Sequence, residues 1–168
     1  IPAGSFKQRS NDTDYPFRAH SAFSHLSGWG ADAVPDSVLV FDPVDGGHEV
    51  TLHLRERADR TTTEFYADAA IGEFWIGPRP SLDEVSAELG IPTAHVDAFQ
   101  ESDRDRTVEV DDELTRFVSE MRLVKDPYEI AQMRLAVEAT RRGFDDIVAE
   151  LPRIIDTPRG ERAIEGVF

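Results

Sequence analysis

Cysteine is absent from this sequence of 168 residues. Its absence excludes a disulfide framework, a thiol nucleophile and any zinc or iron–sulfur site that depends on cysteine ligands. Long hydrophobic runs are also absent, since the longest apolar run, Val38–Phe41, is far too short to span a bilayer. The first residues show no secretory leader.

Basic residues are scarce relative to acidic ones: 18 Lys and Arg stand against 33 Asp and Glu, for a net charge of −15. Duplex nucleic acid and anionic membranes are bound through basic surfaces, so the sequence argues against both as partners. The length predicts one domain with a piece of a second. Because the chain begins at Ile1 and stops at Phe168 inside a helical pattern, we expect it to be part of a longer protein.

The first two thirds of the chain predict short strands and one helix. Val38–Phe41 resembles a buried strand, a turn-rich stretch follows, and His48–Arg55 alternates apolar and polar residues, which together predict a hairpin. Ser81 and Glu84 form a capping box that begins a helix, and Gly90 ends it. Three further short strands are predicted, at Phe74–Ile76, Thr93–Val96 and Thr107–Val110.

Helices dominate the last third. Asp111 caps a helix with an apolar stripe at helical spacing. The run Asp126–Glu129 supplies a cap, a proline at the first helical position and an acid at the third. We expect this helix to reach Leu151 and to end at Pro152, and a third helix to open at Thr157-Pro158.

A domain junction is predicted near residues 123–126, which divides the chain into residues 1–124 and 125–168. The longer helix of the second part carries an apolar stripe that no strand of this chain is left to cover. We expect that stripe to be exposed or to drive association. Its members are Ile130, Met133, Val137, Phe144 and Ile147.

Candidate metal ligands are few. Asp12 and Asp14 could hold a hard cation, but aspartates in this turn-rich stretch more often accept backbone hydrogen bonds, and we favour the turn. The histidine pairs lie five residues apart, which is not the spacing of a zinc-binding helix. Neither a nucleophile elbow nor a phosphate-binding loop occurs, so the residues alone predict an acidic α/β domain without a self-contained active site.

Trp75 and Arg79 are the strongest candidates for a binding loop, because they lie close together after the strand predicted at Phe74–Ile76. An indole suits stacking on a peptide, and a guanidinium suits capture of a carboxylate. Taken alone, however, a tryptophan is more often part of a core, and on that ground the core position is favoured for Trp75.

Several segments in order along the chain resemble bacterial Xaa-Pro aminopeptidases (aminopeptidase P). Tyr15–Phe23 with Leu26–Gly28 is similar to their "YPFR-x-x-S-x-F-x-x-L-[ST]-G" stretch, and Glu73–Arg79 is similar to their "E-x-W-x-G-x-R" loop. Glu120–Ile130 resembles their domain junction, and Glu161–Gly166 resembles the second helix of their catalytic domain.

The resemblance implies an α/β fold: a mixed sheet flanked by helices, as in the N-terminal domain of the creatinase and aminopeptidase P group, followed by the truncated helical start of a pita-bread domain. The complete enzyme would be a cytoplasmic homo-oligomer that removes an N-terminal residue preceding proline. It would use two divalent metals, usually manganese, whose ligands all follow Phe168. We therefore expect no catalytic residue and no metal ligand in this chain, and no activity from the chain alone.

By the same resemblance, this segment shapes the substrate cleft and the assembly of subunits. The substrate-binding candidates are Trp75, Arg79 and Arg18, with the Trp75 loop reaching the cleft of a neighbouring subunit. Two alternatives remain open: a pita-bread relative that binds peptides or proteins without catalysis, and a prolidase or creatinase.

Overall fold

The computed structural model describes residues 1–11, 13–102 and 105–168. They form two compact units, Ile1–Met121 and Arg122–Phe168, and each is described by itself. Within these described ranges, no helix is both long enough and apolar enough to cross a membrane.

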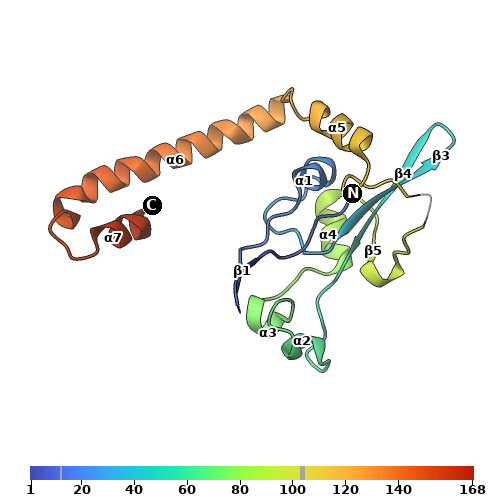
Figure 1. Cartoon of the computed structure of the whole chain (residues 1–168), viewed down its shortest axis with the longest axis horizontal. Helices are drawn as coiled ribbons and strands as arrows, with labels where there is room; N and C mark the ends of the chain where they lie inside the picture. Colours follow the sequence, from blue (N-terminus) through green and yellow to red (C-terminus); the bar gives the residue numbers. More distant parts are fainter. Residues whose placement is uncertain (12, 103–104) are drawn as a thin grey trace. The chain divides into compact units, whose positions relative to one another are not determined.

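A three-stranded mixed sheet forms the centre of the first unit (Figure 1). β3 (Val38–Val44) pairs antiparallel with β4 (Gly47–Leu54), and β4 pairs parallel with β5 (Thr93–His95). The predicted hairpin is confirmed, although β3 continues to Val44, β4 lies one residue earlier than predicted, and the turn shrinks to Asp45-Gly46. Gly46 has φ of +88°, a conformation that such tight hairpin turns require and that glycine adopts without strain.

Helix α4 (Leu82–Leu89) is the last and longest of three helices in the connection between the parallel strands β4 and β5. The capping box of Ser81 and Glu84 is confirmed, and the helix ends at Gly90 in the left-handed conformation. Val85 is fully buried against the sheet. The core of this unit is made of Phe23, Trp29, Leu39, Leu52, Leu54 and Val85 together with small side chains.

Helix α1 (Ser21–Ser27) and the small hairpin of β1 (Gln8–Ser10) and β2 (Thr13–Asp14) precede the sheet, and neither was predicted. His20 caps α1, since its Nδ1 accepts a hydrogen bond from the backbone N–H of Ala22 at 3.3 Å. Of the predicted acidic pair, Asp14 ends β2, whereas Asp12 lies outside the described residues.

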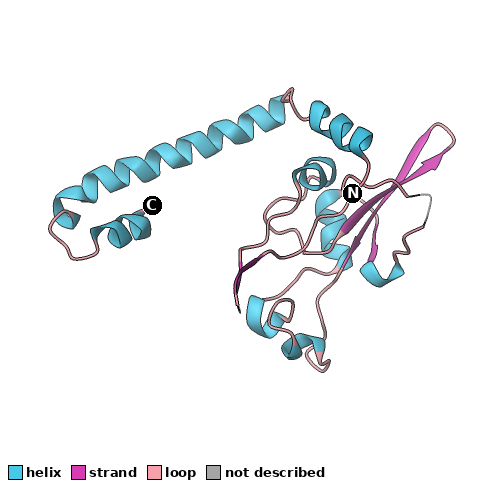
Figure 2. Ribbon diagram, in the orientation of Figure 1, coloured by secondary structure: helices cyan, strands magenta, loops and turns pink. Residues whose placement is uncertain are grey.

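Two strand predictions are wrong. Phe74–Ile76 belongs to the short helix α3 (Glu73–Ile76), which follows another short helix, α2 (Glu64–Ala67), as Figure 2 shows. Residues 107–110 form a turn, in which the Thr107 carbonyl accepts hydrogen bonds from the N–H groups of Val110 and Asp111. β5 stops at His95 because a 3₁₀ turn, η1 (Val96–Ala98), follows it at once.

Helix α5 (Asp112–Met121) closes the first unit. The predicted cap is confirmed, because Asp111 Oδ1 accepts a hydrogen bond from the N–H of Leu114 at 2.9 Å. Val118 is the buried residue of this helix and packs in a small cluster with Ala22 and Val108.

The second unit contains α6 (Pro127–Ile154) and α7 (Gly160–Val167). The predicted start of α6 is confirmed, since Asp126 and Glu129 form a capping box around Pro127. The predicted end is wrong, because Pro152 lies inside the helix, which continues to Ile154. A proline in the last turn removes one backbone hydrogen bond of the helix, which the helix tolerates because it ends two residues later. Similarly, α7 begins at Gly160 rather than at Thr157-Pro158.

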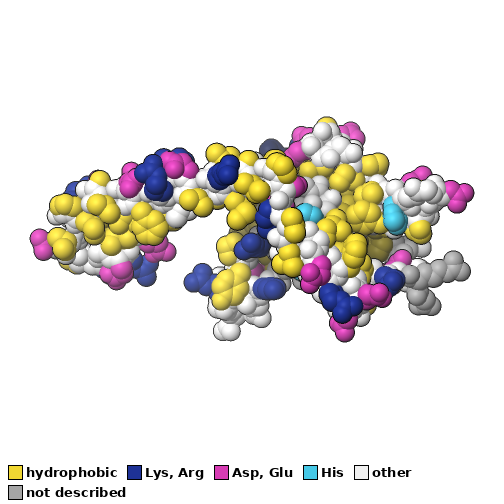
Figure 3. Space-filling model, turned by 90° about the horizontal axis from the view of Figure 1, so that it is seen from above, with side chains coloured by type: hydrophobic (Ala, Val, Ile, Leu, Met, Phe, Trp, Pro, Cys, Tyr) yellow, Lys and Arg dark blue, Asp and Glu magenta, His cyan; other side chains and the backbone are white. Residues whose placement is uncertain are grey.

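The apolar stripe of α6 is largely exposed, as expected. Most of its large side chains face solvent, and hydrophobic groups lie beside charged ones on the surface of this unit, at the left of Figure 3. Phe144 forms an edge-to-face contact with Phe168, with ring centroids 5.5 Å apart. The exposed members of the stripe are Ile130, Met133, Val137 and Phe144, whereas Ile147 is half-buried.

Candidate functional site

Helix α3 is inverted relative to an ordinary surface helix, because its charged residue is buried and its apolar residues are exposed. Of the residues described in α3, Glu73 alone is buried. Phe74, Trp75 and Ile76 are exposed by 65%, 58% and 47%. Surface helices normally place apolar residues toward the core. The core alternative for Trp75 is therefore wrong.

The exposed side chains of α3 and Tyr66 of α2 form what we call the apolar patch: Tyr66, Phe74, Trp75 and Ile76. The indole Nε1–H of Trp75 donates a hydrogen bond to the backbone carbonyl of Tyr66 at 2.9 Å. The rings of Phe74 and Trp75 meet edge to face, with centroids 5.1 Å apart. The indole is therefore fixed at its polar edge while much of its face remains open, an arrangement suited to contact with a peptide.

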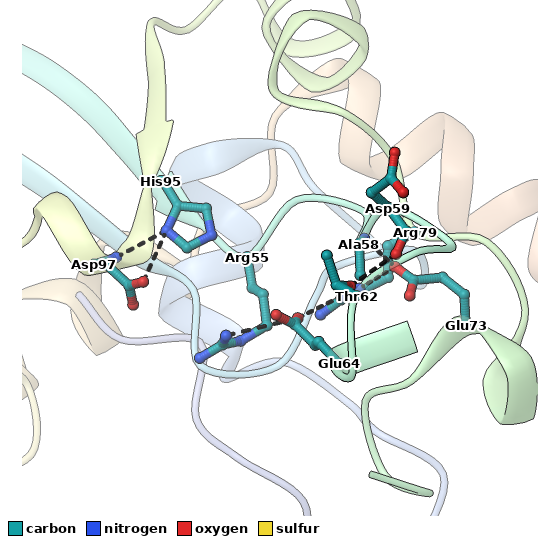
Figure 4. A network of polar contacts seen from close by, with 9 residues as sticks. All are labelled: Arg55, Ala58, Asp59, Thr62, Glu64, Glu73, Arg79, His95 and Asp97. Atoms are coloured by element: carbon teal, nitrogen blue, oxygen red, sulfur yellow. Dashed lines mark hydrogen bonds and ion pairs between the residues drawn. The ribbon is translucent and has the colours of Figure 1, made fainter. Parts of the chain in front are cut away.

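A buried ion pair joins α3 to the loop that follows it (Figure 4). Arg79 Nε donates to Glu73 Oε1 at 2.8 Å, and both side chains are only 5% exposed. Arg79 Nη2 donates to Glu64 Oε1 at 2.7 Å, and Arg55 Nη1 lies 3.6 Å from the same oxygen. The guanidinium of Arg79 thus joins α2 to α3.

Glu73 is held as a carboxylate. Burial raises its pKa, but the hydrogen bonds from Arg79 and from the backbone N–H of Ala58 outweigh burial, so that the pKa lies below its ordinary value. The Ala58 N–H donates to the same oxygen, Oε1, at 2.8 Å. Within the described structure, Glu73 Oε2 and Arg79 Nη1 are buried without a hydrogen-bond partner, so the pair retains one acceptor and one donor group.

The three predicted substrate-binding residues differ in their surroundings. Trp75 is exposed, whereas Arg79 already faces two carboxylates of its own chain. Arg18 is exposed and follows Phe17, whose ring packs against Phe6 with centroids 5.8 Å apart. In the described part of the chain, no hydrogen bond or ion pair joins Arg18 to Trp75 or Arg79. Of the three residues, only Trp75 and Arg79 therefore lie in one segment, which consists of α3 and the loop after it.

An open pocket of about 640 Å³ adjoins the loop that follows α3. Ile76, Gly77 and Arg79 line this pocket together with the aromatic side chains of Phe17 and Trp29. Two of its charged groups, Arg57 and Glu84, form an ion pair with each other. The pocket therefore shows that the loop after α3 lies over the aromatic part of the core rather than apart from the domain.

Metal ligands do not gather in the part of the chain that the structure describes. Over those residues, no group of three or more His, Cys, Asp or Glu side chains lies close enough together to hold a metal ion. The described residues therefore do not fit the two-metal site that the resemblance implies for the complete enzyme.

Sequence reasoning missed Glu64, Gly72 and Glu73. Glu73 begins the E-x-W-x-G-x-R stretch, but its burial could not be predicted, because an acidic residue before an apolar run is usually solvated. Gly72 has no room for a side chain, since a Cβ there would lie 2.6 to 2.9 Å from three backbone carbonyl oxygens of residues 64–68. Glu64 carried no sequence signal, because its partner Arg79 is fifteen residues away.

Comparisons with known proteins agree with the motifs. The family described as "Aminopeptidase P, N-terminal domain" matches residues 1–107. Xaa-Pro aminopeptidase 1 of Streptomyces coelicolor is 40% identical over 190 aligned positions, which cover 100% of this chain and 38% of the relative. Xaa-Pro aminopeptidase 2 of the same organism is 38% identical over 190 positions, which cover 100% of this chain and 39% of the relative.

Solved structures show the same fold. The low-pH form of aminopeptidase P from E. coli matches with a TM-score of 0.56 at 22% identity, covering 99% of this chain and 43% of that one. A zinc-substituted form of the E. coli enzyme in complex with product matches with a TM-score of 0.56 at 23% identity and the same coverage. The predicted fold class, a mixed sheet flanked by helices, is confirmed. The chain spans less than half the length of these proteins.

Proposed function

The chain belongs to the aminopeptidase P family, as its motifs indicate, and we propose that it is the N-terminal part of a metal-dependent Xaa-Pro aminopeptidase. The observation that carries the proposal is the 40% identity to Xaa-Pro aminopeptidase 1 of Streptomyces coelicolor, which extends over the whole chain. The complete enzyme would remove the N-terminal residue of peptides that have proline at the second position.

The remaining properties of the complete enzyme are part of the same proposal. We assign the two divalent metals, usually manganese in this family, to the part of the enzyme beyond this chain. We also propose a cytoplasmic homo-oligomer. Residues 1–124 would form the N-terminal domain and residues 125–168 the start of the catalytic domain. The division of contacts after Met121, close to the expected junction, supports this assignment.

In this enzyme the first unit would shape the substrate cleft through the apolar patch. Trp75 would cover the peptide, reaching the cleft of a neighbouring subunit, and Arg18 would be the accompanying cation, since the other predicted cation, Arg79, is already paired with Glu64 and Glu73. The support is the exposure of three neighbouring apolar side chains on a helix that has no apolar residue in the core. A stiff indole contributes contact area at a low entropic cost.

Steady-state kinetics of the full-length protein test the proposal. Trp75→Ala is expected to lower kcat/KM by roughly tenfold for peptides longer than two residues, which corresponds to about 1.4 kcal/mol. The melting midpoint is expected to change little, because Trp75 is already largely exposed. Val110→Ala, which removes a side chain that is also exposed, is the matched control and is expected to leave both quantities unchanged.

Two results would contradict the proposal. A large fall in melting temperature with unchanged activity per folded molecule would show that Trp75 has only a structural role. A metal-loaded, full-length protein that binds Xaa-Pro peptides but never cleaves them would identify a binding relative instead of an enzyme.

A further inference from the structure

We propose that Glu73 and Arg79 are positioning residues, whose buried ion pair fixes α3 so that the apolar patch is presented at a defined place. The inference rests on the proposed function for the role of the patch, but the ion pair itself is a property of the chain. It assigns to Arg79 a contact within the protein rather than a contact with a substrate carboxylate.

Helix α3 needs an external anchor. It has four residues, and a single turn of helix is not stable by itself in water. Its N-cap residue, Gly72, has no side chain that could cap the helix. Its apolar side chains point outward, so that burial of hydrophobic surface contributes little to holding it. The carboxylate of Glu73 is the part of α3 that enters the domain.

The carboxylate of Glu73 and its partner Arg79 together contact three separate parts of the first unit. Glu73 Oε1 accepts hydrogen bonds from the N–H of Ala58, which follows β4, and from Arg79, which follows α3. Arg79 in turn donates to Glu64 at the start of α2. These bonds have fixed directions, so they set the orientation of α3 as well as its distance from the domain.

The backbone brings the two charged residues together. Gly77 has φ of +90° and reverses the chain directly after α3, which returns Arg79 to Glu73 across six residues. The other end of α3 is fixed by the close approach of Gly72 to the carbonyl groups of α2. With the bond from the Trp75 indole to Tyr66, α2, α3 and the following loop form a closed set of contacts around the ion pair.

Direct capture of a substrate carboxylate by Arg79 is the competing explanation. It conflicts with the geometry, because Nε and Nη2 already donate to carboxylates of the chain and the side chain is 5% exposed. A substrate that displaced Glu73 would leave a buried carboxylate without its charged partner, which is strongly unfavourable, and one that displaced Glu64 would still have to reach a guanidinium that is almost fully buried.

The experiment uses the full-length protein with Glu73→Gln and, as a second variant, Arg79→Lys. Glu73→Gln keeps the size of the side chain and removes its charge. Arg79→Lys keeps the charge but loses the fork that joins two carboxylates. Glu88→Gln, the same change at an exposed position of α4, is the matched control. Hydrogen exchange is measured by mass spectrometry for residues 64–80 and, as an internal reference, for residues 38–54.

For Glu73→Gln we expect exchange in residues 64–80 to rise by roughly tenfold while the sheet residues keep their protection, since local openings are independent of global unfolding. Arg79→Lys is expected to give a smaller rise. Glu88→Gln is expected to give none. Unchanged exchange in residues 64–80 for both ion-pair variants would overturn the inference. If Glu73→Gln does not fold, Arg79→Lys alone decides the matter.

A double-mutant cycle with Trp75→Ala separates positioning from direct contact, because residues that act through one another are not additive. If Glu73 and Arg79 act through Trp75, their variants lower kcat/KM for long peptides in the wild-type background and cause no further loss in the Trp75→Ala background. A loss by Arg79→Lys that persists in full without Trp75 would overturn the inference in favour of substrate contact. If Trp75→Ala itself has no effect on turnover, the proposed role of the apolar patch fails, and the exchange measurement still tests the ion pair.

Discussion

Substitution of Gly72 by alanine tests whether the close approach of α3 to α2 constrains the loop that carries Trp75. A Cβ at this position would lie 2.6 Å from the carbonyl oxygen of Asp68, 2.8 Å from that of Phe65 and 2.9 Å from that of Glu64. All three atoms are backbone, so relief requires the two helices to move apart. Gly72 has φ of −71°, which alanine adopts without strain, so the conflict is purely steric.

The expected cost of Gly72→Ala follows from these contacts. Overpacking of this kind costs about 1–3 kcal/mol. Reduced entropy of the unfolded chain offsets about 0.4–1 kcal/mol of that cost. We expect a net loss of local stability of about 1–2 kcal/mol, which corresponds to roughly 5- to 30-fold faster exchange of the protected amides. Suitable reporters are the N–H groups of Trp75 and Gly77, which bond to the carbonyl groups of Gly72 and Glu73.

Gly30→Ala is the control for the same chemical change. A Cβ at Gly30 would meet nothing within 4 Å, and its φ lies outside the left-handed region. We expect its exchange rates in residues 64–80 to equal those of the parent protein. Equal rates in the Gly72→Ala and Gly30→Ala variants would refute the reasoning that contact with α2 holds α3 in place.

Three further outcomes follow from the packing and charges of the chain. Trp29→Ala removes a core side chain that is 2% exposed, and we expect denaturant unfolding to show a loss of about 3–5 kcal/mol. Bonds from the Ser81 amide and from Arg57 lower the pKa of Glu84 to about 2. Its contribution to the capping box should therefore be complete above the unfolded pKa of about 4.3 and be lost as the pH falls toward 2, a dependence that Glu84→Gln abolishes in exchange measurements on α4. Met133→Glu and Val137→Glu place charge on the exposed stripe of α6. We expect sedimentation to show weaker self-association of the 168-residue chain for these variants than for the parent. Unchanged association would contradict a role for this stripe in self-association.

Much of the fold could be predicted because local signals agree with the tertiary structure. The capping boxes at Ser81 and Asp126 satisfy backbone N–H groups within one turn, so their effect needs no distant partner. The alternation of His48–Arg55 places Leu52 and Leu54 on one face, and both are fully buried. Asp45-Gly46 is a turn sequence whose backbone twist suits a hairpin.

Other elements depend on contacts that no short window contains. Helix α1 was not predicted because Phe17, Phe23 and Leu26 stand at spacings that fit neither a helix nor a strand well, and His20 is an uncommon cap. The end of α6 was misplaced because Pro152 lies where only one ladder bond is at stake. In both cases packing or position along the helix outweighs the residue preference.

The candidate site shows most clearly that contacts distant in sequence cannot be predicted from a short stretch of residues. An apolar run bounded by glycines, Gly72 to Gly77, is typical of a buried strand, and its preceding acid is typical of a solvated residue. Both expectations are reversed, because the partners of Glu73 lie at Ala58 and Arg79 and the second partner of Arg79 lies at Glu64. A carboxylate can be buried when such charge-assisted bonds compensate for its lost hydration, so that α3 can direct its charged residue inward and leave its apolar side chains exposed. The departure from ordinary patterning is therefore itself informative, since α3 gives up hydrophobic burial to expose a tryptophan, and the proposed contact with a peptide would account for an exposure that the stability of the fold does not explain.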